Sequence, residues 1–535
     1  MRKFITLSAV AAFATMSFAS GPSASSDDLR AELEQLKREI AELKKAQEKI
    51  NIKAIKRQIS ALKAKTGGDN LKWNVDFRTA YDVIGYKYAD DTSDWNGIFT
   101  NRLWLGMAYA PTSNLVFKGL LSYYKAYGQV VAPKQGFNYF DWIVNETPNP
   151  AGELRVKEAY WLYLGDDFLG TGIPWTASIG RRPATDGLLV NYREDQDPKS
   201  PIGHIINTEF DGASFKFKLE DAVNVPGMYF KLCMGRGMTN ANVRYAAINQ
   251  NPDGTISISS FKGSEYTKIP GWKSTDLFGF IFVPYDDGQY SVHTTAFKAW
   301  ALPGLVTKEA VVYDMDGNPQ TRADQMVQPT KFKFEQTGDL YGAAISFLAE
   351  GIGDGISDFL DDTNAFISFA WSKTKPNRKP NTIDLNIINA QTGQPIAQMS
   401  VPSEVGMLGS TDDESGTSVY LGVNWPCQLI EDARVGLEFN HGSKYWRSFT
   451  YGEDTLAGSK LATRGNAYEF WFNKDLIGKK LTAQLRYTYM DYDYTGSNAF
   501  FGDGGTPIDI DSQMAKAMGA VEKAQDLRLY IRYRY

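Results

Sequence analysis

Charged side chains of both signs gather in one stretch of this sequence. Between positions 182 and 199 the chain carries Arg182, Arg193, Glu194, Asp195, Asp197 and Lys199. Opposite charges around a narrow passage set up a transverse field, which filters solutes by size and by charge. The stretch therefore predicts the constriction of a water-filled pore, formed by an inward-folding loop at 183–206. An exposed loop with ordinary surface charges is the alternative interpretation.

A second set of basic residues is spaced for one face of a sheet. Successive side chains of a strand point to opposite faces, so Arg528, Arg532 and Arg534 share one face. We predict that they line a lumen with three arginines of other strands, which are Arg78, Arg434 and Arg486. Three lysines have the same phase, and these are Lys216, Lys218 and Lys231. Such a wall either draws anions or is neutralised by ion pairs.

The residues that enzymes use are sparse. The three histidines are scattered, and His441 shares a face with Ser443 without an Asn or Asp partner that the sequence identifies. No metal-ligand spacing or phosphate-binding loop occurs. The chain lacks the C-x-x-C-H motif, which excludes covalently attached c-type haem. We therefore expect no catalytic, cofactor-binding or metal site.

The elements that must position these side chains are strands, because apolar and polar residues alternate with a period of two. From 72 to 83, one face carries residues such as Trp73, Phe77 and Tyr81, and the other carries Asp76 and Arg78. In a soluble sandwich the apolar face would point inward. In an outer-membrane barrel it meets lipid, and the polar face lines the lumen.

The end of the chain favours the barrel. Five residues share the face opposite the three C-terminal arginines, and these are Leu527, Leu529, Ile531, Tyr533 and Tyr535. A terminal aromatic residue after alternating apolar residues is typical of the signal that the outer-membrane barrel insertion machinery reads. We predict that these five residues form that signal.

Sixteen segments have strand character, an even number as closed bacterial barrels require. They lie near 72–83, 99–110, 115–127, 154–164, 175–182, 207–219, 227–235, 277–283, 289–300, 339–348, 363–373, 417–424, 432–440, 466–473, 480–494 and 525–535. Short and long connections alternate between them, which is typical of periplasmic turns and outer loops. The segments predict an all-β transmembrane barrel of about 16 antiparallel strands over 69–535, and 18 strands are the alternative.

The first 68 residues are of a different kind. Residues 1–19 have the basic start, apolar stretch and small cleavage-site residues of a signal peptide. Within 20–68, an apolar heptad repeat predicts a periplasmic coiled-coil helix, with contacts through Leu33, Leu36, Ile40 and Leu43. The alternative is an amphipathic helix that folds back on the body of the protein.

Composition excludes several classes of protein. After residue 19 no apolar run approaches the roughly 18 residues that a spanning helix needs, so a helical membrane protein is excluded. The 43% hydrophobic content excludes a disordered chain. The net charge is −5, whereas a nucleic-acid partner would call for a basic chain.

Four stretches of the sequence resemble a known family. They are Trp73-Asn-Val-Asp-Phe-Arg-Thr-Ala-Tyr81, Asn101-Arg-Leu-Trp-Leu105, Gly180-Arg-Arg-Pro-Ala-Thr-Asp-Gly187 and His204-Ile-Ile-Asn-Thr-Glu-Phe-Asp-Gly212. Through them the chain is similar to a bacterial outer-membrane family catalogued as a domain of unknown function, with a short N-terminal coiled coil. The resemblance covers nearly the whole mature chain. It implies a porin-like barrel and carries no activity or substrate.

These observations lead to a function hypothesis. We expect an outer-membrane porin for passive diffusion of small hydrophilic solutes or ions, surrounded by lipid and lipopolysaccharide and assembled as a homotrimer. The second hypothesis is a structural or adhesive outer-membrane protein whose long surface loops bind outside partners. A barrel hydrolase is the third.

Overall fold

The structure is a computed structural model of the 535-residue chain. It describes residues 71–129, 148–149, 152–182, 187–196, 199–241, 248–251, 253–258, 268, 271–314, 326–353, 355–450, 455–499 and 501–535. The predicted signal peptide and the predicted coiled coil lie outside the described residues. Within the described ranges, no helix is long and apolar enough to cross a membrane.

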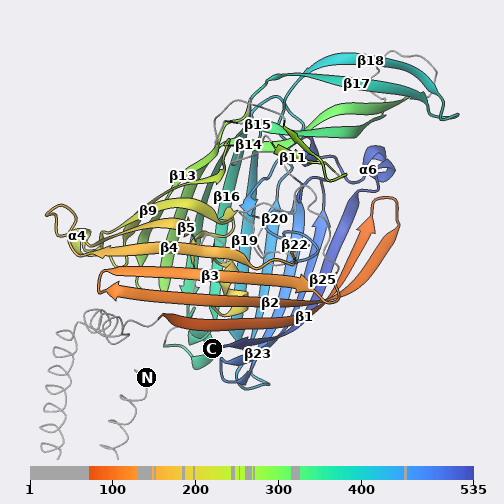
Figure 1. Ribbon diagram of the computed structural model, residues 1–535. Helices are drawn as coiled ribbons and strands as arrows, with labels where there is room; N and C mark the ends of the chain where they lie inside the picture. The colour runs from red at the N-terminus through yellow and green to blue at the C-terminus, as the bar shows by residue number, and fades with distance from the viewer. Residues whose placement is uncertain are drawn as a thin grey trace, which may run out of the picture. The chain divides into compact units, whose positions relative to one another are not determined.

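Sixteen long strands form the body of the protein, and each matches a segment predicted from the sequence (Figure 1). They are β1 (Lys72–Tyr88), β2 (Ser93–Thr112), β3 (Leu115–Ala126), β4 (Arg155–Gly165), β5 (Trp175–Arg182), β9 (Phe210–Lys218), β10 (Tyr229–Met238), β13 (Thr275–Asp286), β14 (Tyr290–Asp314), β15 (Met326–Glu350), β16 (Asn364–Pro376), β19 (Ser415–Pro426), β20 (Ala433–Gly442), β22 (Gly465–Ile477), β23 (Leu481–Tyr492) and β25 (Val521–Arg534).

The sixteen strands close into a barrel. Each pairs antiparallel with its neighbours, and β1 pairs with β25 to complete the ring. The closing register places Arg78 opposite Arg532 and Asp82 opposite Arg528. Reciprocal backbone hydrogen bonds of 2.9 Å between Val75 and Tyr535 carry the seam to the last residue. The prediction of a sixteen-stranded barrel is confirmed.

The period-two pattern separates the two faces of the barrel wall. In β1, Arg78 and Asp82 are fully buried and point inward, whereas Phe77 and Tyr81 are 39% and 37% exposed on the outside. In β25, the outward residues are 43 to 54% exposed, and these are Leu527, Leu529, Ile531 and Tyr533. Tyr535 follows on the same face and is 74% exposed. The outer surface is therefore apolar and aromatic, as a lipid-facing surface requires.

The two ends of the barrel differ. One end, called here the turn end, carries short connections such as 113–114, 287–289 and 478–480. The opposite loop end carries the connections at 183–209, 239–274, 377–414, 443–464 and 493–520. A correction concerns β1 and β2, which continue past their predicted ends to a short turn at 89–92.

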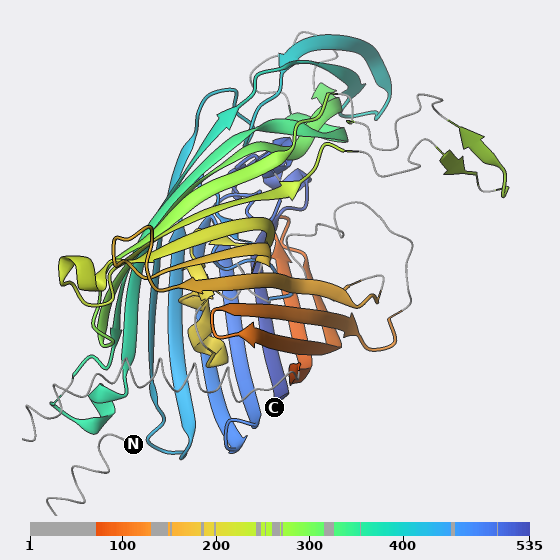
Figure 2. The ribbon, with the colours of Figure 1, turned by 60° about the vertical axis from the view of Figure 1, so that its left-hand side comes forward.

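An arm extends from the loop end (Figure 2), and the pairings show that four strands form it. Its core is the outer halves of β14 and β15, which run well past the predicted ends at 300 and 339. β17 (Pro380–Asn389) pairs in parallel with β14, and β18 (Pro395–Glu404) pairs with β17. Four buried side chains hold β14 and β17 together, and these are Ala310, Val312, Leu385 and Ile387.

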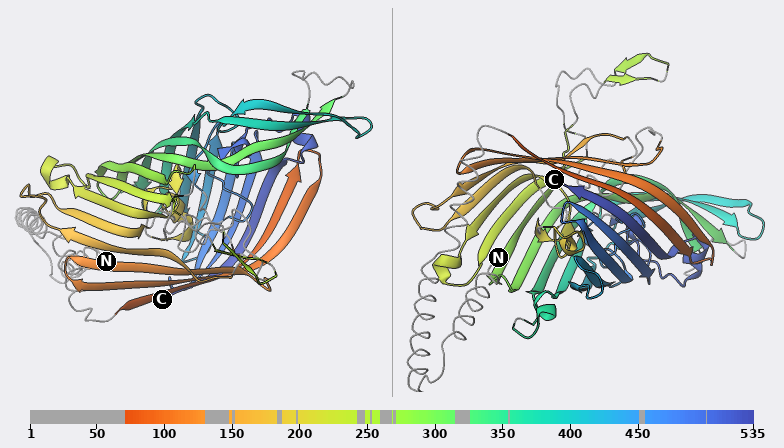
Figure 3. Two further views of the ribbon diagram at one scale, coloured as in Figure 1. Left: turned by 45° about the horizontal axis from the view of Figure 1, so that its top comes forward. Right: turned by 90° about the horizontal axis from the view of Figure 1, so that it is seen from below.

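The segments 187–196 and 199–209 lie inside the ring of strands, where they are drawn in yellow (Figure 3). Their elements are β6 (Gly187–Leu188), the 3-10 helix η3 (Val190–Glu194), β7 (Lys199–Ile202) and β8 (Ile206–Asn207). β8 pairs in parallel with β21 (Phe449–Thr450) of the 443–464 connection. Two connections of the loop end therefore meet inside the barrel.

The inward loop packs on an apolar part of the wall. The loop contributes six buried apolar residues, which are Leu188, Leu189, Val190, Ile202, Ile205 and Ile206. They join inward residues of β13 to β19 in one cluster, among them Leu277, Phe297, Leu340, Leu348 and Phe366. The period-two pattern predicts polar inward faces, and this half of the barrel differs because the loop docks on an apolar surface.

Candidate functional site

The inward loop is attached to one wall by His204. Its Nδ1 lies 2.9 Å from Ser368 Oγ of β16, and its Nε2 lies 2.9 Å from Ser418 Oγ of β19. The ring is fully buried, and this burial lowers the pKa of His204 to about 3. The imidazole is therefore neutral at physiological pH, which suits hydrogen bonding to two hydroxyl groups.

The opposite side of the loop is attached through Glu194, at the end of η3. The Glu194 carboxylate pairs with Arg532 of β25 and accepts a 3.1 Å hydrogen bond from the Tyr530 hydroxyl. Arg78 and Arg486 approach the same carboxylate at 3.7 and 3.8 Å. Glu194 is only 6% exposed. A single buried carboxylate therefore contacts three of the arginines that were predicted to line the wall.

A second charged network lies beside it and includes Arg193. Arg193 lies 3.4 Å from the carboxylate of Glu469 in β22. Lys460, from the 443–464 connection, pairs with Glu469 at 2.5 Å and also with Glu438 of β20. Lys460, Glu438 and Glu469 are not predicted from the sequence, because they lie on separate elements that only the fold brings together. The one feature of the sequence that points to Glu438 and Glu469 is their position in the alternating pattern, which places both side chains on the inward face of their strands.

The remaining predicted constriction residues are spread over the depth of the barrel. Asp195 binds Lys479 of the β22–β23 turn at 2.8 Å, so it reaches the turn end. Lys199 pairs with Glu158 of β4 at 2.6 Å. Arg182, at the end of β5, is buried with its guanidinium 4.6 Å from the ring centroid of Tyr160. Asp197 lies outside the described residues.

The predicted wall arginines fall into two groups. Arg78, Arg486, Arg528 and Arg532 are at most 2% exposed, and Arg528 pairs with Asp82 as Arg532 does with Asp76. Two others are half-buried, with Arg534 bonded to the carbonyl of Asp195 and Arg434 bonded to Asn424. The structure brings Arg78, Arg486 and Arg532 together with the loop, and Arg434 stands apart from that network.

A cavity of about 1210 Å³ opens below η3 at the turn end. Basic and acidic side chains both line it, among them Arg434, Arg534, Lys479, Asp195 and Glu350. Amide groups line it as well, and they belong to Asn74, Asn191, Asn364, Asn424, Asn473 and Gln196. This mixed lining can hydrogen-bond water and hydrophilic solutes.

The structure also supplies the partner that the sequence lacked for His441. Its Nδ1 lies 3.0 Å from Oδ1 of Asn466, the residue directly opposite on β22. Ser443 Oγ instead accepts a 2.9 Å hydrogen bond from the backbone N–H of Thr417. Within the described ranges, no group of three or more His, Cys, Asp or Glu residues is placed to hold a metal ion.

Comparisons with known proteins give one family and several solved barrels. Comparison with curated proteins gives no match. An anion-selective porin from Comamonas acidovorans is 10% identical with a TM-score of 0.44, and the match covers 87% of this chain and 100% of that one. OprB of Pseudomonas putida is 11% identical with a TM-score of 0.42, over 88% and 96% of the two chains.

The family comparison covers most of the barrel. The model of the family described as "Protein of unknown function (DUF3373)" matches residues 92–535, from the second strand to the last residue. That range includes the inward loop, the arm and the charged networks except for their residues on β1, such as Arg78. The chain therefore belongs to the DUF3373 family.

Proposed function

We propose that the protein is an outer-membrane porin for passive diffusion of small hydrophilic solutes or ions. The observation that carries the proposal is the closed sixteen-stranded barrel with an apolar outside and a charged inside that holds an inward loop. An apolar outer wall places such a barrel in a bilayer, and polar inward groups keep water in its lumen.

The same proposal covers location and assembly. The barrel lies in the bacterial outer membrane among lipid and lipopolysaccharide, with the turn end and the N-terminal helix in the periplasm. The insertion machinery reads the outward face of β25, and the coiled coil joins three copies. The exposure of Leu527, Leu529, Ile531, Tyr533 and Tyr535 supports the insertion step.

In this proposal the inward loop narrows the pore. Arg193 and Glu194 lie inside the barrel and bind neighbouring parts of the wall, on β22 and β25, which supports a constriction at the level of η3. The predicted roles of Arg182, Asp195, Asp197 and Lys199 belong to the same proposal. Their wider spread suggests a passage with charges at several depths.

A second candidate is a structural or adhesive protein. The arm supports it, because β18 is an exposed edge strand at the end of a four-stranded sheet beyond the barrel. Edge strands offer unpaired backbone groups to another chain. Catalysis has less support, since Ser443 bonds the backbone of Thr417, and we propose that the protein has no enzymatic role.

Conductance in planar lipid bilayers tests the porin proposal. The purified full-length mature protein is added at low concentration, and the current is recorded at fixed voltage. Reproducible stepwise increases in current are expected for a porin. A protein that inserts, as shown by heat-modifiable migration, yet gives no steps would contradict the proposal and favour the adhesive candidate.

A further inference from the structure

The cavity at the turn end has one wall that four adjacent strands build. Glu350, the last residue of β15, lies directly opposite Asn364 of β16, and Asn364 lies directly opposite Asn424 of β19. Arg434 of β20 is hydrogen-bonded to Asn424. All four side chains line the cavity. A carboxylate, two amides and a guanidinium therefore stand in a row, one from each strand.

Hydrogen bonds within this row fix the orientation of the two amides. Arg434 donates to Oδ1 of Asn424 from Nε at 3.2 Å and from Nη2 at 2.6 Å. Nδ2 of Asn364 donates to the same oxygen at 3.3 Å. Because three donors share the oxygen of Asn424, its NH2 group remains for a ligand. Asn364 is the donor in its contact, so its oxygen remains.

The charged groups at the two ends of the row are positioned as well. Nη2 of Arg434 also donates to the carbonyl of Asp362 at 2.7 Å, and Nη1 remains. Oε1 of Glu350 accepts a 3.1 Å hydrogen bond from the Tyr192 hydroxyl, and Oε2 remains. The Tyr192 ring is held by stacking on Phe366, with 5.9 Å between the ring centroids. Among the described residues, the four remaining groups of the row have no protein partner.

The row offers two acceptors followed by two donors. In strand order these are a carboxylate oxygen of Glu350, the amide oxygen of Asn364, the amide nitrogen of Asn424 and the guanidinium of Arg434. The complementary molecule has a cation, a donor, an acceptor and an anion in this order. An extended tripeptide has this order, because the N–H and the C=O of its middle residue point to the same side, between the ammonium and the carboxylate.

The length of the row agrees with this ligand. Neighbouring strands lie about 4.8 Å apart, so the three steps from β15 to β20 span about 14 Å. The bond from Arg434 to Asn424 brings the guanidinium inward and shortens the distance between the two charged groups. A fully extended tripeptide is about 10 Å long. The two charges of a single amino acid share one carbon atom and cannot reach both ends.

Other classes of solute leave part of the row unused. A sugar offers hydroxyl groups to the two amides but no charge to Glu350 or Arg434. A simple ion meets a charge of its own sign at one end of the row. Hydrogen bonds to charged groups are roughly twice as strong as those between neutral groups. The two ends therefore favour a zwitterion that is long enough to bind both.

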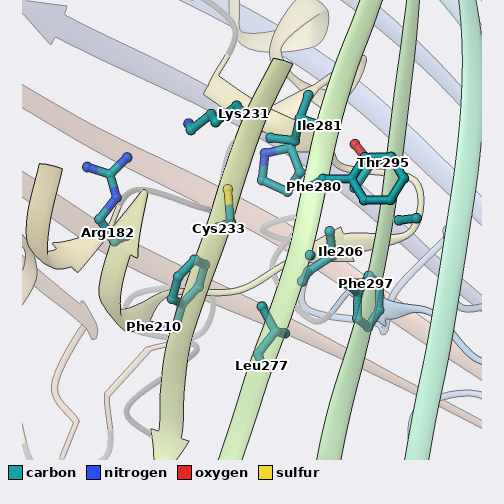
Figure 4. A pocket seen from close by; sticks show the side chains of 13 residues that line it. Arg182, Ile206, Phe210, Lys231, Cys233, Leu277, Phe280, Ile281, Thr295 and Phe297 are labelled. Carbon is teal, nitrogen blue, oxygen red and sulfur yellow. The ribbon is translucent and has the colours of Figure 1, made fainter. Parts of the chain in front are cut away.

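The size of the cavity leaves room for the side chains of a peptide. Its volume of about 1210 Å³ is above the roughly 300 to 1,000 Å³ of common ligand pockets. The cavity between β10, β13 and the inward loop, where Cys233, Ile206 and Phe297 lie, is different (Figure 4). It has about 30 Å³, which is room for a water molecule but not for a solute. The turn-end site therefore selects the backbone and the ends of its ligand and not its side chains.

We infer that the solutes of this barrel are short peptides, with tripeptides as the best fit. Glu350 binds the ammonium group, Asn364 and Asn424 bind the middle residue, and Arg434 binds the carboxylate. The inference rests on the proposed porin function and names the class of solute that the porin carries. It places the recognition of the solute at the turn end and not at the charges of η3.

The test is equilibrium binding to the detergent-solubilised full-length mature protein, measured by isothermal titration calorimetry. The probes are trialanine, N-acetyl-trialanine, trialanine amide and maltose. Trialanine is expected to bind at least about tenfold more tightly than either blocked peptide, since each block removes one charge-assisted hydrogen bond. Maltose, an uncharged polar solute, should bind more weakly than trialanine.

Variants assign the two ends of the ligand. In Glu350→Gln, trialanine and N-acetyl-trialanine should bind equally, and the preference over trialanine amide should persist. In Arg434→Gln, trialanine and its amide should bind equally. Glu404→Gln is the matched control, because it removes a carboxylate from the exposed end of β18 in the arm and should leave all ratios unchanged. If a variant does not insert, the ratios of the wild type decide.

The outcomes separate the two proposals. A wild type that binds trialanine no better than the blocked peptides or maltose overturns the peptide inference, and conductance in planar bilayers would leave the porin proposal standing. An unchanged preference over N-acetyl-trialanine in E350Q overturns the role of Glu350. Binding as expected by a protein that inserts without conductance overturns the porin proposal and leaves the peptide site in place.

Discussion

At the scale of single residues, Glu194 holds the inward loop to one wall more than any other side chain described above. Its carboxylate is buried between Arg78, Arg486 and Arg532. Replacing one partner of a buried ion pair leaves uncompensated charge and costs about 3 to 5 kcal/mol. Because the group is buried and paired, we expect its neutralisation to act on loop docking and not on ion selectivity.

The corresponding variant is Glu194→Gln, which keeps the shape and removes the charge. We expect a lower midpoint temperature of heat modification, together with larger and noisier single-channel currents as the loop loosens. Asp195→Asn is the matched control, because Asp195 is 41% exposed and its pair with Lys479 should contribute at most about 1 kcal/mol. Equal effects of the two substitutions would show that the Glu194 network does not hold the loop.

His204 makes the docking of the loop depend on pH. In the unfolded chain its pKa is 6.5, and burial lowers it to about 3 in the folded protein. Between these two pKa values the unfolded chain binds a proton that the folded protein does not bind. The free energy of unfolding therefore has its full value above pH 6.5 and decreases on acidification toward pH 3. The expected slope is on the order of 1 kcal/mol for each pH unit.

The measurement is the midpoint of heat modification between about pH 7 and pH 4. In His204→Gln the amide can still bond Ser368 and Ser418 but cannot take up the proton, so this part of the pH dependence should disappear. Parallel curves for wild type and variant would mean that other groups, and not His204, govern the acid sensitivity.

At the scale of elements, β25 closes the barrel and presents the residues of the predicted insertion signal to the outside. Replacing Tyr533 and Tyr535 together with Asp should block insertion, because the outward face loses its aromatic end while the inward arginines remain. Leu429→Asp is a suitable control, since Leu429 lies in the β19–β20 turn and is 94% exposed. The readout is the membrane-inserted, heat-modifiable fraction, and normal insertion of the double variant would exclude β25 as the recognised strand.

All sixteen barrel strands could be predicted from the sequence, because every outward face is apolar and polar inward groups give most of the strands a period of two. Two residues did not fit that period, and the structure explains both. Glu158 lies beside a register shift between β3 and β4, where it pairs with Lys199. Lys298 faces outward but bonds Asp339 at 3.2 Å and lies 5.0 Å from the ring centroid of Trp300.

Other features of the fold could not be read from the sequence. β17 and β18 lie beyond the barrel, where no lipid imposes a phase, and β17 pairs with β14, which is distant in the chain. Leu340 and Leu348 point inward because they pack on the inward loop. The path of that loop cannot be predicted from the alternation of residues along the strands. The charged networks could not be predicted for the same reason, because Lys460, Glu469 and Arg193 lie on three separate elements and come into contact only in the folded protein.

At the scale of the whole molecule, the arm and the barrel can be separated. The backbone N–H of Val405 donates to the carbonyl of Lys379 at 2.9 Å, so the two ends of the β17–β18 hairpin lie side by side. Replacing 380–404 with a short glycine-rich turn should therefore leave barrel insertion and conductance intact. Loss of cell-surface adhesion with unchanged conductance would assign binding to the arm, and loss of insertion would show that the arm is part of the barrel's folding unit.

The contact between β8 and β21 has a consequence for how the protein is made. The Thr450 hydroxyl donates to the carbonyl of Gly203, 247 residues earlier in the chain, inside a ring that β1 and β25 close. Contacts between such distant residues form slowly, because the intervening chain must first lose its freedom. Most of the chain must therefore be in place before the two loops can pair. The slowest step of assembly should then be the docking of the two loops inside a barrel whose strands are already paired. This step would be visible as a heat-modifiable intermediate in which the contacts of Glu194 and His204 have not yet formed.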